Sequence, residues 1–162
     1  MRRRRLAVLV VLGISALGGA AIAYDWARDS ARQAGADGGA SGVRAVTLYK
    51  SPSCDCCKGY VAHLRGAGFR VQAVDLEDLS PTKRRLGIPP ALESCHTAAI
   101  DGYIVEGHVP IADIERLLAK RPDVPGIALP GMPAGAPGMP GPKPAQLTLY
   151  TIEKQPRAFP AL

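Results

Sequence analysis

The chain contains few aromatic residues: they make up 5% of its 162 residues, and only two are phenylalanine. No patch of lysine and arginine has aromatic residues interleaved with it, although that arrangement is typical of nucleic-acid-binding surfaces. We therefore expect no nucleic-acid partner. The sequence also lacks any constellation of residues that would support acid–base or serine-hydrolase chemistry, and it has no long internal repeat.

The excess of positive charge is concentrated in the first residues of the chain. The whole sequence has 20 Lys and Arg against 14 Asp and Glu, a formal net charge of +6. Four of the basic residues are the arginines at positions 2–5, and residues 1–23 contain no acid, so the remainder carries a net charge of only +2. The basic pI therefore comes largely from this leader and is no evidence for nucleic-acid binding.

The amino-terminal residues have the pattern of an export segment. The arginines precede the uncharged stretch 6–23, which ends in Ala21-Ile22-Ala23, a sequence that resembles a small-x-small cleavage site. Residues 1–23 are predicted to be a signal peptide or a retained membrane anchor, because the apolar stretch is marginal in length for spanning a bilayer. Either alternative places the rest of the chain in the periplasm and leaves the N-terminal segment as its only contact with the membrane. Residues 24–44, rich in Ala, Gly and Asp, predict a flexible linker.

Residues 45–122 predict one α/β domain. Periodicity and turn signals predict strands at 46–49, 69–74, 96–100 and 103–106, and helices at 56–65, 80–87 and 110–120. In the second strand, Phe69, Val71 and Ala73 are expected to face inward. Asp101-Gly102 between two apolar runs is a strong hairpin signal. The order β-α-β-α-β-β-α, with a cysteine motif at the first strand-to-helix turn, favours a thioredoxin-like architecture.

Residues 123–162 predict a Pro/Gly/Met-rich C-terminal extension that packs on the domain. Residues 124–144 are dominated by Pro, Gly and Ala, a composition that cannot form a helix. Such a segment either wraps over the domain as an ordered loop or stays mobile. A strand-like stretch follows at 146–152.

Four cysteines carry the chemistry, and Cys54, Cys56 and Cys57 lie within four residues. They lie at the start of the predicted helix at 56–65, whose positive end favours the thiolate form. A purely structural Cys54–Cys57 disulfide would close a very short loop and contribute little stability. In dithiol–disulfide exchange, Cys54 would attack and Cys57 would resolve. Two features argue against the exchange interpretation. Cys56 adds a third thiol to the pair, and the negative charge of Asp55 opposes thiolate formation.

The third interpretation of the cysteines is a soft-metal site. Cys95 and His96 stand directly before a predicted strand, at the loop that faces the active cysteines in thioredoxin-like folds. His108 follows the hairpin, and Met132 and Met139 lie in a loop long enough to fold back over the site. Thiolate, thioether and imidazole ligands together select Cu(I), whereas zinc has little use for methionine.

Several motifs occur in order along the chain: YKSPSCDCC (49–57), GIPP (87–90), ESCHTA (93–98), DGY (101–103), EGHVP (106–110), PGMP (130–133) and PGM (137–139). This set resembles the periplasmic copper-resistance proteins of the CopG type. The resemblance implies a thioredoxin-like domain whose C-terminal extension helps to bind copper, and cysteine sulfurs that bridge more than one copper ion. It also implies a role in interconverting Cu(I) and Cu(II) during copper detoxification. Asp55 departs from the family pattern, in which a small residue often stands there.

The leading hypothesis is a periplasmic copper-binding protein, monomeric and active in copper resistance, with periplasmic copper-efflux components as partners. If it turns over as a copper oxidoreductase, Cys54 and Cys57 are its catalytic residues. Two alternatives stay open: a thiol–disulfide oxidoreductase, and a passive copper chaperone or buffer. His63 is expected to be a partly exposed helix residue. The predicted ligands are Cys54, Cys56, Cys57, Cys95, His96, His108, Met132 and Met139.

Overall fold

The structure is a computed structural model that describes residues 43–144 and 146–160. The predicted signal peptide or anchor at 1–23 and nearly all of the predicted linker at 24–44 lie outside these residues. Among the helices of the described part, none has the length and hydrophobicity that crossing a membrane requires.

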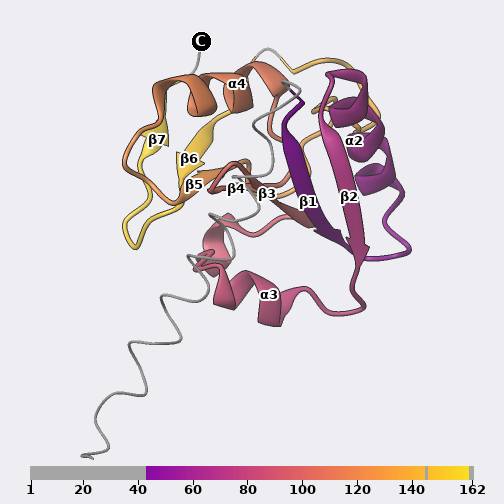
Figure 1. The fold of residues 1–162 in the computed structure, drawn as a ribbon, viewed down its shortest axis with the longest axis horizontal. Helices are drawn as coiled ribbons and strands as arrows, with labels where there is room; N and C mark the ends of the chain where they lie inside the picture. The colour runs from indigo at the N-terminus through magenta and orange to yellow at the C-terminus, as the bar shows by residue number, and fades with distance from the viewer. Residues whose placement is uncertain (1–42, 145, 161–162) are drawn as a thin grey trace, which may run out of the picture.

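A seven-stranded mixed sheet forms the centre of the molecule, with strand order β2-β1-β3-β4-β5-β6-β7 (Figure 1). The β1–β2 and β4–β5 pairs are parallel, and the other neighbours are antiparallel. The strands are β1 (Ala45–Lys50), β2 (Arg70–Asp75), β3 (His96–Ile100), β4 (Tyr103–Glu106), β5 (Gly126–Ala128), β6 (Leu149–Thr151) and β7 (Ala158–Phe159). The helices are α2 (Asp55–Gly66), α3 (Ser80–Arg85), the 3₁₀ turn η1 (Pro90–Leu92) and α4 (Ile111–Lys120).

The element order from β1 to α4 is the predicted β-α-β-α-β-β-α. The hairpin signal is also confirmed, because β3 and β4 pair across Asp101-Gly102. Both turn residues have positive φ, 48° for Asp101 and 85° for Gly102, as a two-residue turn that matches the strand twist requires. Local patterns therefore predicted the elements of this part of the chain to within a few residues.

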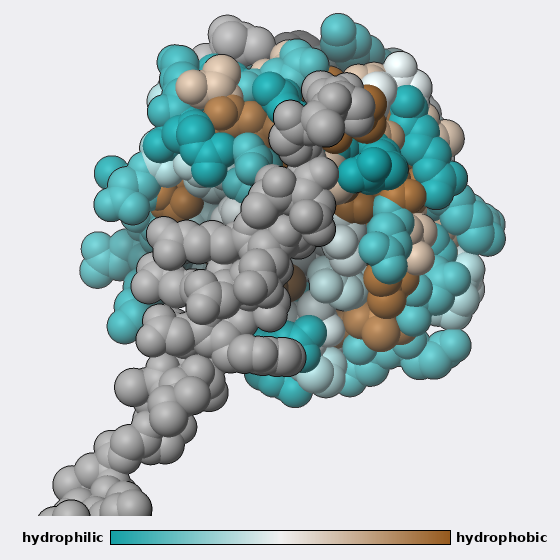
Figure 2. Space-filling view, viewed as in Figure 1, coloured by the Kyte–Doolittle hydropathy of each residue, from teal (hydrophilic) through white to brown (hydrophobic). Residues whose placement is uncertain are grey.

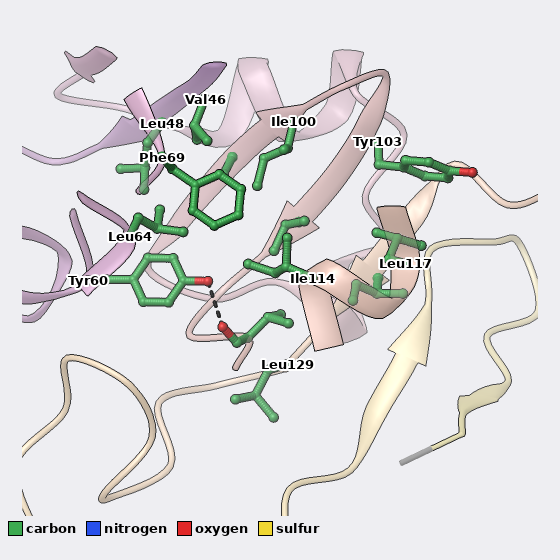
Figure 3. Close-up of a cluster of buried hydrophobic side chains, with 14 of the residues drawn as sticks. Val46, Leu48, Tyr60, Leu64, Phe69, Ile100, Tyr103, Ile114, Leu117 and Leu129 are labelled. Atoms are coloured by element: carbon green, nitrogen blue, oxygen red, sulfur yellow. Dashed lines mark hydrogen bonds between the residues drawn. The ribbon is translucent and has the colours of Figure 1, made fainter. Parts of the chain in front are cut away.

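Two groups of buried side chains lie on opposite faces of the sheet. Val105 of β4 belongs to the larger group, while its neighbour Ile104 packs against the smaller one, and successive strand residues point to opposite faces. In the larger group, Tyr60 from α2 and Ile114 from α4 meet over the strands (Figure 3). The helices α2 and α4 therefore cover one face. The smaller group, on the side of α3 and η1, is Ile88, Leu92, Ala128 and Ile152.

Two features of the sheet differ from the sequence-based expectations. Phe69 and Val71 are buried as expected, but Ala73 is exposed, because β2 is an edge strand that only β1 flanks. The short strand β5 was not predicted within the Pro/Gly-rich stretch, yet it pairs with β4 inside the sheet. All three residues of β5 are buried, so they show no alternation that a sequence pattern could reveal.

Hydrophobic residues on the face shown in Figure 2 form small separate patches among hydrophilic ones. Within the described residues, Val43 and Met132 are the large hydrophobic residues that stay exposed. Single exposed hydrophobic side chains are normal on soluble domains. Met132 nevertheless stands out because the sequence assigns it a ligand role.

The close approach of β5 to β4 predicts that Gly126 cannot be enlarged. A Cβ at Gly126 would lie 1.9 Å from the carbonyl oxygen of Ile104. We expect Gly126→Ala to lower the free energy of unfolding by about 2 kcal/mol, a typical overpacking penalty. Gly66, at the end of α2, is the control, because a Cβ there meets nothing within 4 Å. Urea denaturation followed by circular dichroism measures both variants, and equal stabilities would contradict the placement of β5.

Candidate metal centre

The triple-cysteine turn connects β1 to α2. The backbone N–H of Cys54 donates to the carbonyl of Ser51 at 3.2 Å, and α2 begins at the next residue, Asp55. Cys54 is therefore the N-cap residue, and Cys56 and Cys57 lie in the first helical turn. The free N–H groups and the positive end of the helix dipole favour negative sulfur at all three positions.

The second part of the site comes from the other side of the β1–β3 pair. Because these strands are antiparallel, Lys50 at the end of β1 pairs with His96 at the start of β3. Cys95 therefore lies beside the turn that follows β1. The β3–β4 hairpin adds His108, whose position is set by the hydrogen bond of 3.0 Å from the N–H of Gly107 to the carbonyl of His96. The turn after β1, the residue before β3 and the residues after β4 therefore meet at one end of the sheet.

The side chains of these segments converge on Cys95. Its Sγ lies 3.9 Å from Sγ of Cys56, 3.1 Å from Nε2 of His108 and 3.4 Å from Nδ1 of His96. Sγ of Cys56 in turn lies 3.4 Å from Sγ of Cys54. Two groups of candidate ligands result, each with its atoms within 4.8 Å of one another, and Cys95 belongs to both. The first group is Cys54, Cys56, Cys57 and Cys95. The second group is Cys95, His96 and His108.

Two of the four sulfurs are joined in this structure. Cys54 and Cys57 form a disulfide, while Cys56 and Cys95 are free thiols. Cys57 is buried, and its Sγ also lies 3.6 Å from the carbonyl oxygen of Cys95. Burial, followed by the neighbouring Cys56, raises the pKa of Cys95. A cation that binds Cys95 must therefore displace its proton, which makes binding favourable at higher pH.

The two histidines are oriented as neutral ligands. Nδ1 of His108 lies 2.7 Å from the carbonyl oxygen of Pro137. A carbonyl only accepts, so Nδ1 carries the proton and the Nε2 lone pair faces Cys95. His96 is buried, and its Nε2 has no hydrogen-bond partner among the described residues. Burial, then repulsion from His108 and Lys83, lowers the pKa of His96 to about 3, and burial also lowers the pKa of His108.

Tyr60 supports both imidazoles from within the larger hydrophobic group. Its ring centroid lies 4.5 Å from that of His96 and 5.4 Å from that of His108. The hydroxyl donates to the carbonyl of Val109 at 2.7 Å, the bond dashed in Figure 3. Burial raises the pKa of Tyr60, so the hydroxyl stays protonated. The ring packing and the hydrogen bond restrict the orientations that the imidazoles can take.

A buried ion pair holds the segment that carries Cys95. Lys83 of α3 and Glu106 of β4 are 4% and 0% exposed and form a salt bridge. The carboxylate of Glu106 also accepts the backbone N–H of Ser94 and the hydroxyl of Thr97, each at 2.6 Å. These contacts flank Cys95 on both sides along the chain. The sequence did not single out either charged residue, because charged side chains are mostly exposed.

The two Pro-Gly-Met turns of the C-terminal segment contact the same part of the molecule through their backbones. The carbonyl of Gly131 accepts from the hydroxyl of Ser94, next to Cys95. Gly138 has a φ of 80° and packs so closely on α2 that a Cβ there would lie 2.6 Å from the backbone nitrogen of Tyr60. The segment that includes these turns therefore lies against the cysteine–histidine cluster.

The side chains of the two methionines differ in their surroundings. Met132 is 56% exposed, whereas Met139 is partly buried and packs against the larger hydrophobic group. The ligand role of both methionines stays a prediction. His63, in the last turn of α2, is exposed as expected, with its ring centroid 6.5 Å from that of Tyr60.

Comparisons with known proteins agree on one group of relatives. Residues 92–139 match a family described as "Protein of unknown function, DUF411". The solved structure "Copper resistance protein copG- Form 2" is 40% identical, with a TM-score of 0.65 over 72% of this chain and 94% of that one. "Copper resistance protein copG- Form 1" is also 40% identical, with a TM-score of 0.64 over 71% and 92%. No curated protein sequence matches the chain.

The buried ion pair predicts a large loss of stability when one partner is removed. We expect Lys83→Met to lower the free energy of unfolding by about 3 kcal/mol, because it leaves the Glu106 carboxylate buried without its cation. The double variant Lys83→Met/Glu106→Gln should recover part of this loss, since the charge is gone and the amide still accepts hydrogen bonds. A double-mutant cycle from urea denaturation measures the coupling, and additive effects would contradict the pairing.

Proposed function

The chain belongs to the CopG family of copper-resistance proteins, and from this membership and the geometry of the cluster we propose that it binds copper ions in copper resistance. One observation carries the proposal: the sulfur of Cys95 belongs to both groups of candidate ligands. A thiolate with two sets of partners can bridge two ions. The arrangement therefore supports binding of more than one copper ion.

The donor set fits a soft cation. Sulfur and neutral imidazole ligands suit Cu(I), and Nδ1 of His96 and Nε2 of His108, which both lie beside the Cys95 sulfur, are available for coordination. Hard cations such as Mg²⁺ prefer oxygen ligands, whereas the side chains of both candidate groups offer sulfur and imidazole nitrogen. In our proposal Met132 and Met139 add thioether ligands from the turns packed beside the site.

The same ligands support a redox role. A set of sulfurs that bridges several ions spreads charge over them, so the ions can change oxidation state with little rearrangement. We therefore propose that the protein interconverts Cu(I) and Cu(II), with Cys54 and Cys57 as the residues that take part in electron transfer. On this proposal the protein is a copper oxidoreductase.

The proposal extends to organisation and location. The cysteine turn between β1 and α2, facing the start of β3, is the arrangement on which we base a thioredoxin-like assignment for 45–122. Residues 123–162 would act as an extension of that domain. The arginine-led apolar stretch 1–23 supports export to the periplasm, as a cleaved signal or an anchor. There a monomer would exchange copper with efflux components.

A second candidate function is favoured by one specific observation. The Cys54–Cys57 disulfide has the C-x-x-C spacing of thiol–disulfide oxidoreductases, and Cys54, at the helix N-cap, is its more accessible sulfur. Exchange with protein thiols would need only these two residues. The two candidate functions therefore differ in their dependence on Cys56.

Copper binding by the histidine part of the site can be tested with a pair of histidine variants. We expect His108→Ala to weaken Cu(I) binding by roughly tenfold or more, because it removes a ligand whose orientation the Pro137 carbonyl fixes. His63→Ala, which removes an exposed histidine of α2, should bind as the wild-type protein does. Anaerobic titration of fully reduced protein against a chromogenic Cu(I) chelator measures both affinities. Wild-type protein that takes up no Cu(I) would refute the proposal.

Replacing Cys56 separates the two candidate functions. In Cys56→Ser the Cys54–Cys57 pair is kept, so reduction of a disulfide substrate should continue at the wild-type rate. The copper site, in contrast, loses the sulfur that lies between Cys54 and Cys95. We expect the bound copper per chain, measured by elemental analysis, to fall. Exchange at the wild-type rate together with a copper content that the substitution leaves unchanged would favour the second function instead.

A further inference from the structure

The disulfide divides the candidate ligands into two sets. Cys54 and Cys57 are joined, and a disulfide sulfur is a poor ligand for a cation compared with a thiolate. The other four donors are two thiols and two imidazoles, from Cys56, Cys95, His96 and His108. The group of Cys95, His96 and His108 contains neither disulfide sulfur, so its donors remain in either state of the pair.

We propose that Cys54 and Cys57 are the electron store of the copper site: their dithiol reduces two Cu(II) ions and closes to the disulfide, and the other four donors hold the Cu(I) products. This inference rests on the proposed copper-binding function and adds the source and number of the electrons. It assigns electron storage to Cys54 and Cys57 and copper binding to Cys56 and Cys95.

The reaction balances without any further oxidant. The two thiols lose two protons and two electrons, and one S–S bond forms between Cys54 and Cys57. Each Cu(II) gains one electron and becomes Cu(I). For the next cycle, an external protein dithiol reduces the disulfide by exchange and is itself oxidised to a disulfide. Its attack falls on Cys54, because Cys54 is only partly buried whereas Cys57 is fully buried.

The geometry favours this pair over the other sulfurs. Cys95 is held between two imidazole nitrogens, at 3.1 and 3.4 Å, and is thereby placed as a ligand. Cys56 and Cys57 are adjacent and cannot readily pair with each other. Cys54 and Cys57 lie one helical turn apart at the start of α2, with Cα atoms 5.3 Å apart, within the normal range for a disulfide.

The electrons pass over a short path. Sγ of Cys56 lies 3.4 Å from Sγ of Cys54 and 3.9 Å from Sγ of Cys95. A cation bound to Cys56 therefore lies next to the dithiol and to the histidine group at once. Soft sulfur ligands stabilise Cu(I) relative to Cu(II), so the remaining donors favour the reduced product.

The test uses fully reduced protein and anaerobic additions of copper(II) sulfate. We expect about two Cu(I) ions for each disulfide formed, because the disulfide couple transfers two electrons. A chromogenic Cu(I) chelator counts the Cu(I), electron paramagnetic resonance follows the loss of Cu(II), and alkylation with peptide mass mapping identifies the disulfide. A Cys56–Cys95 disulfide, a disulfide between chains, or persistent Cu(II) signal would overturn the inference.

Variants separate this inference from the proposed function. In Cys54→Ser the Cys54–Cys57 disulfide cannot form, so the yield of Cu(I) from Cu(II) should fall well below the value of about two per chain. Cu(I) added directly still binds to Cys95, His96 and His108, with an affinity that lacks the contribution of the Cys54 sulfur. Ser53→Ala, an exposed neighbour, is the control and should behave as the wild-type protein. If Cys54→Ser reduces Cu(II) with the wild-type yield, the electron store is wrong and copper binding stands. If the wild-type protein binds no Cu(I), the proposed function itself fails.

Discussion

The antiparallel pairing of β1 with β3 is the constraint on which the site depends. It places the end of β1, with the cysteine turn behind it, beside the start of β3, where Cys95 and His96 lie. A shift of this register by one residue would turn Cys95 and His96 to the opposite faces of the sheet and separate the sulfurs. The β3–β4 hairpin then adds His108 through its own short turn. The ends of β1, β3 and β4 thus hold the ligands together at one end of the sheet.

Buried side chains next to this end of the sheet hold the segment that carries Cys95 and His96 in position. The Lys83–Glu106 pair joins α3 to β4 and binds the backbone on both sides of Cys95, while Tyr60 packs against the imidazoles from α2. The two faces of the sheet therefore contribute different kinds of support, one ionic and one aromatic. Buried charges are stable only when paired and hydrogen-bonded, and here each carboxylate oxygen has such partners.

The C-terminal segment is part of the same unit in the described structure. Its strand β5 pairs with β4, and its two Pro-Gly-Met turns contact Ser94 and α2 through backbone atoms. The carbonyl of Pro137 selects the tautomer of His108, so a residue of this segment determines which nitrogen faces the sulfurs. Proline and glycine suit such a segment because it must turn repeatedly while passing close to other backbone.

The sequence by itself determined the local features. Strand and helix periodicity, the Asp101-Gly102 turn and the spacing of Cys54, Cys56 and Cys57 depend on neighbouring residues, and the elements from β1 to α4 agree with them. The resemblance carried by ordered motifs identified the family, and its solved members agree. The tertiary structure decided the rest: the buried strand β5, the exposure of Ala73 and the pairing of Lys83 with Glu106. These depend on which distant segment lies alongside, and no local pattern encodes that choice.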